Sequence, residues 1–304
     1  MDKISKEYQE IIHEVKILPV EQLDIERVEK LIRAYIADKN YEKALEVLRV
    51  VEEREKNNPS INSEFGYCLV ELKQFDEAAK YFLKAKNQGR EDAWIYSQLG
   101  WAYRNVEKYK EALEAYLKAQ QLGNKVAWTN AEIGMCYKEL GKYEEAIEKF
   151  EYALSLKDEE KDLAFIYGQL GWCYHQLENY EKALEYQLKA KEEGRNDSWT
   201  NIEIAICYEN LDNYEKALDY ALIAYDLDRD NIRILSEVAW IYDCMDNYEE
   251  GLPFLLRAEE LGRDDEWIKT EIAMNLGRSG KLSEGIEKLK ESLTMVDEAD
   301  INRK

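Results

Sequence analysis

Proline and glycine are scarce in this chain. Of its 304 residues only 3 are proline and 14 are glycine, so few positions can serve as turns or as a flexible linker. Length alone would suggest two ordinary domains, but a composition this poor in turn-forming residues is typical of helices joined by short connections. The scarcity therefore predicts a mostly helical protein.

Long apolar runs and basic runs are also missing. No stretch of about 18 apolar residues occurs, and the first 18 residues, MDKISKEYQEIIHEVKIL, mix charges into any apolar core that a signal peptide would need. The 64 acidic and 42 basic side chains give a net charge of −22, which repels phosphate backbones and anionic lipid surfaces. We therefore expect a cytoplasmic protein that binds neither nucleic acid nor membranes.

Residues suited to catalysis or metal binding are few and scattered. The chain has two histidines, and its five cysteines are an odd number for a secreted disulfide framework, which fits a reducing compartment. No glycine-rich run could cradle a phosphate, and no nucleophile lies beside a plausible base. The sequence predicts neither an enzyme nor a cofactor or metal site.

Tyrosine, with 22 copies, is abundant, and much of it belongs to a repeated phrase. NYEKALE at Asn40–Glu46 returns seven more times in variants such as KYKEALE and NYEEGLP. Its ring position falls at Tyr41, Phe75, Tyr109, Tyr143, Tyr180, Tyr214 and Tyr248, and then at Leu282. The step is 34 residues throughout, apart from one step of 37 that contains a three-residue insertion near residues 157–162. A fixed period of this length is the mark of a repeat architecture.

One repeat places Tyr96, Leu99, Gly100, Tyr103, Ala112 and Tyr116 in the pattern W-x2-L-G-x2-Y followed by A-x3-F. The chain therefore resembles the tetratricopeptide repeat family, in its bacterial multi-repeat form. The resemblance implies an all-α, right-handed α-solenoid of eight 34-residue helix-turn-helix repeats with a concave groove. The repeats cover residues 25–58, 59–92, 93–126, 127–160, 164–197, 198–231, 232–265 and 266–299. Residues 1–24 are expected to hold an N-terminal capping helix, and residues 300–304 form a tail.

Small residues and loop residues support this division into helices. Gly100 and Ala112 lack bulk, so the two helices of their repeat are expected to approach closely. A G-R-x-D loop stands where the family usually has proline, and its aspartates are well placed to cap the next helix. These are Asp92, Asp197 and Asp265. Four cysteines share the tenth place of their repeats and are expected to fill the core.

All seven tryptophans occupy two places in the first helix of a repeat. The second place holds Trp94, Trp128, Trp199 and Trp267, and the ninth place holds Trp101, Trp172 and Trp240. Seven residues turn a helix by about 700°, so both places share one face, roughly opposite the face that packs on the second helix. In the resembled family this face lines the peptide-binding groove. We therefore expect the tryptophans to contact a partner.

Carboxylates follow the same face. The sixth place holds Glu132, Glu203, Glu237 and Glu271, beside small residues such as Ser97 and Gly168, and His175 lies nearby at the twelfth place. Aromatic rings beside carboxylates suit a ligand that carries Arg or Lys. The expected partner is a protein or peptide segment that is basic and has apolar anchors.

Two alternative interpretations stay open. A second-place tryptophan could pack on the preceding repeat under its own loop arginine, as in the pairs Arg90 with Trp94 and Arg195 with Trp199. The glutamates could form an ordinary solvated face of an acidic helical protein.

The sequence thus predicts a non-catalytic interaction scaffold. The alternatives are a regulator that senses a signalling peptide and an accessory subunit of a larger enzyme or of a toxin-neutralising defence assembly. The last repeat carries Leu282, Ile286 and Leu289 at an edge that no further repeat covers, so a homodimer through the C-terminal repeat is a further expectation.

Overall fold

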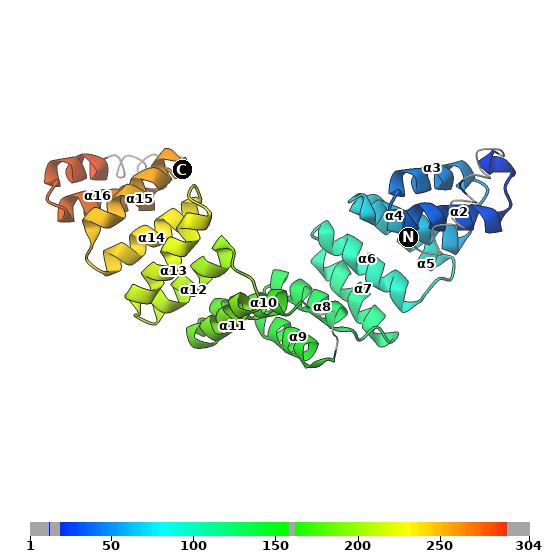
Figure 1. Ribbon diagram of the computed structural model, residues 1–304, viewed down its shortest axis with the longest axis horizontal. Helices are drawn as coiled ribbons and strands as arrows, with labels where there is room; N and C mark the ends of the chain where they lie inside the picture. Colours follow the sequence, from blue (N-terminus) through cyan, green and yellow to red (C-terminus); the bar gives the residue numbers. More distant parts are fainter. Residues whose placement is uncertain (1–11, 13–18, 158–161, 291–304) are drawn as a thin grey trace, which may run out of the picture. The chain divides into compact units, whose positions relative to one another are not determined.

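The structure is a computed structural model that describes residues 12, 19–157 and 162–290. Within these residues it contains helices and no strand. A 3-10 helix, η1 (Val20–Gln22), comes first and is followed by regular α-helices (Figure 1). These are α2 (Ile25–Ala37), α3 (Tyr41–Val51), α4 (Pro59–Glu71), α5 (Phe75–Asn87), α6 (Ala93–Asn105), α7 (Tyr109–Gln121), α8 (Ala127–Glu139), α9 (Tyr143–Ser155), α10 (Leu163–Gln176), α11 (Tyr180–Glu192), α12 (Ser198–Asn210), α13 (Tyr214–Leu227), α14 (Ile232–Cys244), α15 (Tyr248–Glu260) and α16 (Glu266–Arg278). Residues 282–290 are also helical.

Consecutive helices pair as helix-turn-helix repeats. The first helix of a repeat contacts the second extensively, as α6 contacts α7 and α10 contacts α11. The recurrent ring residue opens each second helix, from Tyr41 in α3 to Tyr248 in α15. The all-α fold of eight repeats is therefore confirmed, with α16 and the helix at 282–290 as the eighth pair.

The chain divides into two compact units, Met1–Glu159 and Glu160–Lys304. The first contains α2 to α9, and the second contains α10 to α16. Within each unit, every second helix also contacts the first helix of the following repeat, as α5 contacts α6 and α13 contacts α14. This serial stacking buries apolar faces that no single helix pair could cover alone.

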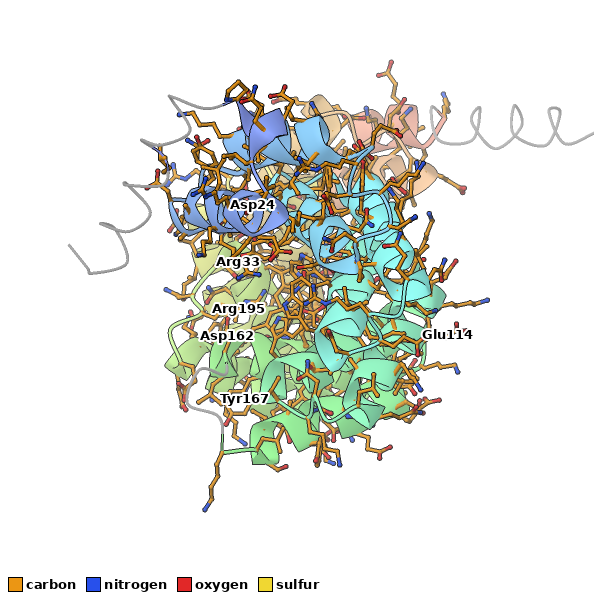
Figure 2. All side chains as sticks on the ribbon, turned by 90° about the vertical axis from the view of Figure 1, so that its right-hand side faces the viewer. Asp24, Arg33, Glu114, Asp162, Tyr167 and Arg195 are labelled. Carbon is orange, nitrogen blue, oxygen red and sulfur yellow. The ribbon has the colours of Figure 1, made fainter. Side chains whose placement is uncertain are left out.

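Side chains of the connecting loops fix where the helices begin. The Asp92 carboxylate accepts the backbone N–H of Ile95 at 2.9 Å, and Asp197 and Asp265 cap α12 and α16 in the same way. The three predicted caps are thus confirmed. Asp24 and Asp162, both labelled in Figure 2, cap α2 and α10. Each cap satisfies a backbone donor that the first turn of a helix leaves without a partner.

Glycines in the first helix let the two helices of a repeat approach each other closely. A Cβ atom added to Gly100 would lie 2.8 Å from the ring of Tyr116, and one added to Gly134 would lie 2.9 Å from Phe150. Both rings are completely buried, so they fill the space that the glycines leave open. The predicted close approach at Gly100 is confirmed, and it orients each first helix with its opposite face outward.

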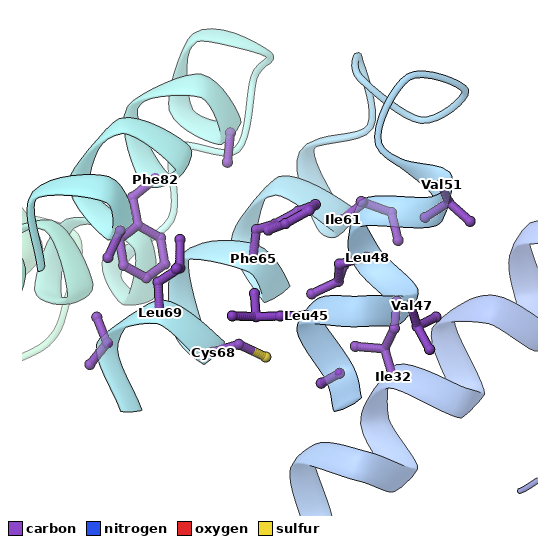
Figure 3. Close-up of a cluster of buried hydrophobic side chains, with 14 of the residues drawn as sticks. Ile32, Leu45, Val47, Leu48, Val51, Ile61, Phe65, Cys68, Leu69 and Phe82 are labelled. Atoms are coloured by element: carbon purple, nitrogen blue, oxygen red, sulfur yellow. The ribbon is translucent and has the colours of Figure 1, made fainter. Parts of the chain in front are cut away.

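The core runs between successive repeats. Figure 3 shows part of it in the first unit, where Phe65 and Leu69 of α4 lie between Leu48 of α3 and Phe82 of α5. Cys68 belongs to the same cluster. Cys136, Cys173 and Cys207 are also buried, so the prediction that the tenth-place cysteines fill the core is confirmed.

Some expectations concern residues outside the described part of the chain. Residues 1–11 and 13–18, which make up most of the predicted N-terminal capping segment 1–24, and the tail at residues 300–304 fall there.

Candidate partner-binding surface

The first helices of successive repeats lie against one another. In the first unit α4 contacts α2 and α6, and in the second unit α12 contacts α10 and α14. All seven tryptophans lie on such helices, which are α6, α8, α10, α12, α14 and α16. In each unit taken by itself, we call the outward side of these helices its first-helix surface; Trp128 lies on that of the first unit and Trp240 on that of the second.

Loop arginines cover three of the four second-place tryptophans. The guanidinium carbon lies 4.8 Å from the ring centre for Arg90 over Trp94, 4.7 Å for Arg195 over Trp199, and 4.1 Å for Arg263 over Trp267. These are cation–π contacts, as the alternative interpretation of the second place predicts. One face of each of these rings is therefore occupied by the protein itself.

The same arginines explain the small residues at the fifth place. Arg263 donates a hydrogen bond to Ser236, and the Arg195 guanidinium passes so close to Gly168 that a Cβ there would lie 2.4 Å from it. Where the loop has Asn124 in place of arginine, its amide donates to the Ser97 hydroxyl at 2.7 Å. The small residues therefore accommodate a side chain from the loop that ends their own repeat. Sequence reasoning assigned them to the groove and missed this role.

Trp128 is the second-place tryptophan without a loop arginine. It packs against Trp101 with ring centres 5.8 Å apart and against the edge of Tyr116 at 5.9 Å. Arg104 covers Trp101 with its guanidinium at 4.7 Å. Trp128 lies at the end of this stack and remains 42% exposed. It is the most exposed tryptophan on the first-helix surface of the first unit.

In the second unit Trp240 has the corresponding role. It is 40% exposed, and its indole N–H donates to the Glu209 carboxylate at 3.0 Å. This hydrogen bond fixes the orientation of the ring while leaving much of it in solvent. Trp172, the remaining ninth-place tryptophan, is half-buried in α10.

Most of the predicted glutamate ladder is not exposed. Glu132, Glu203 and Glu271 are buried, so the alternative of an ordinary solvated face is wrong for these three residues. The Glu132 carboxylate binds the Arg104 guanidinium at 2.7 Å and accepts the Tyr116 hydroxyl at 3.2 Å. Burial raises the pKa of Glu132, and the Arg104 charge and the Tyr116 hydrogen bond oppose that rise.

Glu203 is the most completely enclosed carboxylate of the ladder, with 0% of its surface exposed. It lies 2.7 Å from Nδ1 of His175 on α10 and accepts a hydrogen bond from Arg233 of α14 at 2.6 Å. Burial disfavours its charge, but the His175 hydrogen bond and the charges of His175 and Arg233 outweigh burial and hold the pKa below its ordinary value. His175 thus has an internal role, for which the sequence offered no signal.

The pKa of Glu237 is shifted in the opposite direction from that of Glu203. Burial, and then repulsion from Glu209 and Glu203, raises its pKa to about 7, although Arg233 and His175 act in the other direction. The pKa of Glu271 is raised as well, by burial and by the negative charge of Asp243. The positive charge of Arg278 partly offsets this rise. Carboxyls with raised pKa values on a partly open surface are candidates for function.

A cavity of about 540 Å³ opens on the first-helix surface of the second unit. Its walls come from α14, from α16 and from the loop before α16. They include Glu237, Trp240, Arg263 and Trp267. The cavity therefore combines two indole rings with charged groups of both signs, a lining that suits an amphipathic side chain.

Two kinds of feature are absent from the described residues. They contain no group of three or more His, Cys, Asp or Glu side chains placed to hold a metal ion. Across the same residues, no helix has the length and apolar character needed to cross a membrane.

The repeats match known families. Three family models, each described as a tetratricopeptide repeat, match residues 35–99, 95–122 and 125–192. The comparison with curated protein sequences gave no match.

Solved structures share this fold, and two of the following three are described as tetratricopeptide repeat proteins. One is Cut9–Hcn1, an APC/C hetero-tetramer, with 15% identity and a TM-score of 0.59; the match covers 90% of this chain and 53% of that chain, so this chain spans about half its length. A second is the C-terminal part of a repeat protein from Cytophaga hutchinsonii, with 17% identity, a TM-score of 0.60, and coverage of 79% and 98%. A third is YrrB, described as a protein with an unusual peptide-binding site, with 26% identity, a TM-score of 0.52, and coverage of 61% and 94%.

Proposed function

The chain belongs to the tetratricopeptide repeat family, and from this premise we propose that it is a non-catalytic interaction scaffold. Its partner is a basic protein or peptide segment whose apolar side chains contact the first-helix surface. The carrying observation is the pair of open tryptophans, Trp128 and Trp240, each held in place by neighbouring side chains. Exposed indoles that are already oriented lose little conformational entropy when they bind.

Two further observations support this proposal. YrrB, at 26% identity, is described as having a peptide-binding site, and its matched region covers 61% of this chain. The net charge of −22 favours encounter with a basic partner. Because Arg104, His175 and Arg233 already pair with Glu132 and Glu203, the attraction arises from the remaining acidic excess rather than from those two carboxylates.

We expect Trp128→Ala and Trp240→Ala each to weaken partner binding by about thirtyfold, which corresponds to losing one aromatic anchor. The partner would be captured from the native cell, identified and titrated against the purified variants. Tyr152→Ala is the matched control, because Tyr152 is 43% exposed but lies on α9, a second helix. Binding that is unchanged in both tryptophan variants, or equally weakened in the control, would contradict the proposal.

The captured partner also separates the remaining possibilities. A short secreted peptide would identify a signalling-peptide sensor, and a folded protein from a larger complex would identify an accessory subunit. Affinity for either kind of basic partner should fall as ionic strength rises.

We further propose that a second copy of the chain covers the exposed side of the helix at 282–290. Leu282, Ile286 and Leu289 are all exposed there, and their spacing of four and three residues places them on one helix face. The double variant Leu282→Glu with Ile286→Glu should convert a dimer into a monomer, measured by light scattering over the micromolar range. A wild-type protein that is monomeric throughout that range would overturn this proposal.

A further inference from the structure

A recurring contact joins the first helices of neighbouring repeats. The twelfth place of one first helix meets the sixth place of the next: Arg104 of α6 binds Glu132 of α8 at 2.7 Å, and His175 of α10 binds Glu203 of α12 at 2.7 Å. In both units this contact supplies a basic group to a buried carboxylate. These two interfaces show how a basic side chain at the twelfth place can compensate a buried carboxylate at the sixth place.

The interface between α12 and α14 differs from both of these. Its twelfth-place residue is Glu209 and its sixth-place residue is Glu237, so a carboxylate stands where Arg104 and His175 stand elsewhere. Repulsion from Glu209 is the largest charge effect on Glu237. In the described part of the chain no ion pair forms on either residue; Glu209 instead accepts hydrogen bonds from the Trp240 indole and from the Asn210 amide.

At the next interface, between α14 and α16, other side chains compensate two facing carboxylates. There the twelfth-place Asp243 faces Glu271, again acid against acid. Arg278 of α16 binds Asp243 at 3.0 Å, and the Asn275 amide donates to it at 2.9 Å. No comparable guanidinium reaches Glu209 within residues 162–290.

The charges around Glu237 leave a local deficit of positive charge. The ionisable groups near it are His175, Glu203, Glu209 and Arg233, together with Arg263 and Asp265 at the cavity wall. Two guanidiniums and the His175 imidazole thus face four carboxylates when Glu237 is ionised. Arg233 is committed to Glu203, and Arg263 to Asp265. In the free protein a proton on Glu237 reduces the deficit.

We propose that the cavity lined by Glu237 and Trp240, whose indole is held by Glu209, binds a cationic side chain, Arg or Lys, of the partner segment. The cation would occupy the electrostatic position that Arg104 occupies in the first unit, and its methylene stem would lie along the indole of Trp240, as the Arg104 guanidinium lies over Trp101. Entry of the cation ionises Glu237, and the displaced proton passes to solvent. The subsite rests on the proposed function, because it seats one side chain of the same partner.

The test uses N-acetyl-arginine amide as the probe and N-acetyl-citrulline amide, which is nearly isosteric and neutral, as its control. The carboxyl of Glu237 would be followed by NMR of ¹³C-labelled glutamate during pH titration. We expect the arginine probe, and not the citrulline probe, to lower the pKa of Glu237 from about 7. Because the proton competes with the cation, probe affinity should be about tenfold higher at pH 8 than at pH 6.

Two variants make this test specific. Glu209→Arg builds the Arg104-like pair into the protein, so it should abolish the response to the probe, and Glu237→Gln should abolish the pH dependence that Glu237 contributes. Glu181→Gln, on an exposed position of α11, should change neither. Equal responses to both probes, or an undiminished response in Glu209→Arg, would overturn the subsite. The proposed scaffold function would survive that result if partner binding still depended on Trp128 and Trp240.

Discussion

Replacing Arg233 by alanine is expected to lower the free energy of unfolding by about 3 kcal/mol at pH 7. Glu203 is fully buried, and Arg233 supplies one of its two charged contacts. Removing the guanidinium leaves a buried carboxylate with His175 alone. The value is at the low end for breaking a buried ion pair, because Arg233 itself is half-exposed and loses little hydration. Urea denaturation at pH 7 measures the loss.

The pH dependence gives this prediction a second readout. The folded-state pKa of Glu203 lies below its ordinary value, so its contribution to stability is present above about pH 4.5 and disappears as the pH falls through the folded-state pKa. The difference between wild type and Arg233→Ala should therefore shrink in acid. Arg229→Ala is the control, because Arg229 pairs with Asp226 in solvent and should change stability by less than about 0.5 kcal/mol. Equal losses in the two variants would contradict the assignment.

Replacing Glu237 by glutamine is expected to stabilise the protein at pH 8. Its folded-state pKa of about 7 lies above the ordinary carboxyl value of 4.5, so the folded protein holds a proton that the unfolded chain releases. Stability associated with that proton is complete below pH 4.5 and is lost as the pH rises to about 7. A rise of the Glu237 pKa from 4.5 to about 7 corresponds to a loss of roughly 3 kcal/mol in the free energy of unfolding at pH 8. Because the cavity is open to water, hydration reduces the expected loss to about 2 kcal/mol.

Glutamine resembles the protonated acid, so Glu237→Gln should gain this stability at pH 8 and almost none at pH 4.5. Thermal unfolding at the two pH values, with Glu181→Gln as the exposed control, measures the difference. A variant that is no more stable than wild type at pH 8 would show that the charge of Glu237 is already compensated in the free protein. A residue that destabilises its own fold when ionised is expected at a binding site rather than in a purely structural position.

The regular features of this protein followed from its sequence. The 34-residue period located the start of every second helix from Tyr41 to Tyr248, because the same residues recur at the same packing positions. The close approach at Gly100 and the caps at Asp92, Asp197 and Asp265 were also predictable, since both are local consequences of side-chain size and loop geometry. Stacking of Arg90 on Trp94 was foreseen as an alternative, because the two residues are four positions apart.

The candidate site was harder to predict. Glu132, Glu203, Glu237 and Glu271 share one place in the repeat and appear equivalent in the sequence. In the structure Glu203 has a lowered pKa and Glu237 a raised one, because their neighbours from the preceding repeat are His175 in one case and Glu209 in the other. Those neighbours lie 28 residues away, at a place that the repeat pattern does not mark.

By itself, therefore, the sequence determined the helices, their pairing into repeats and the face on which the tryptophans lie, since all three depend on spacing within about 34 residues. Only the tertiary structure decided which of the tryptophans and glutamates remain available to a partner. Availability depends on contacts across repeat interfaces: loop arginines cover Trp94, Trp199 and Trp267, and Arg104 and His175 engage Glu132 and Glu203. Glu209 and Glu237, by contrast, form no ion pair in the described part of the chain, although the interface between α12 and α14 brings these two carboxylates together.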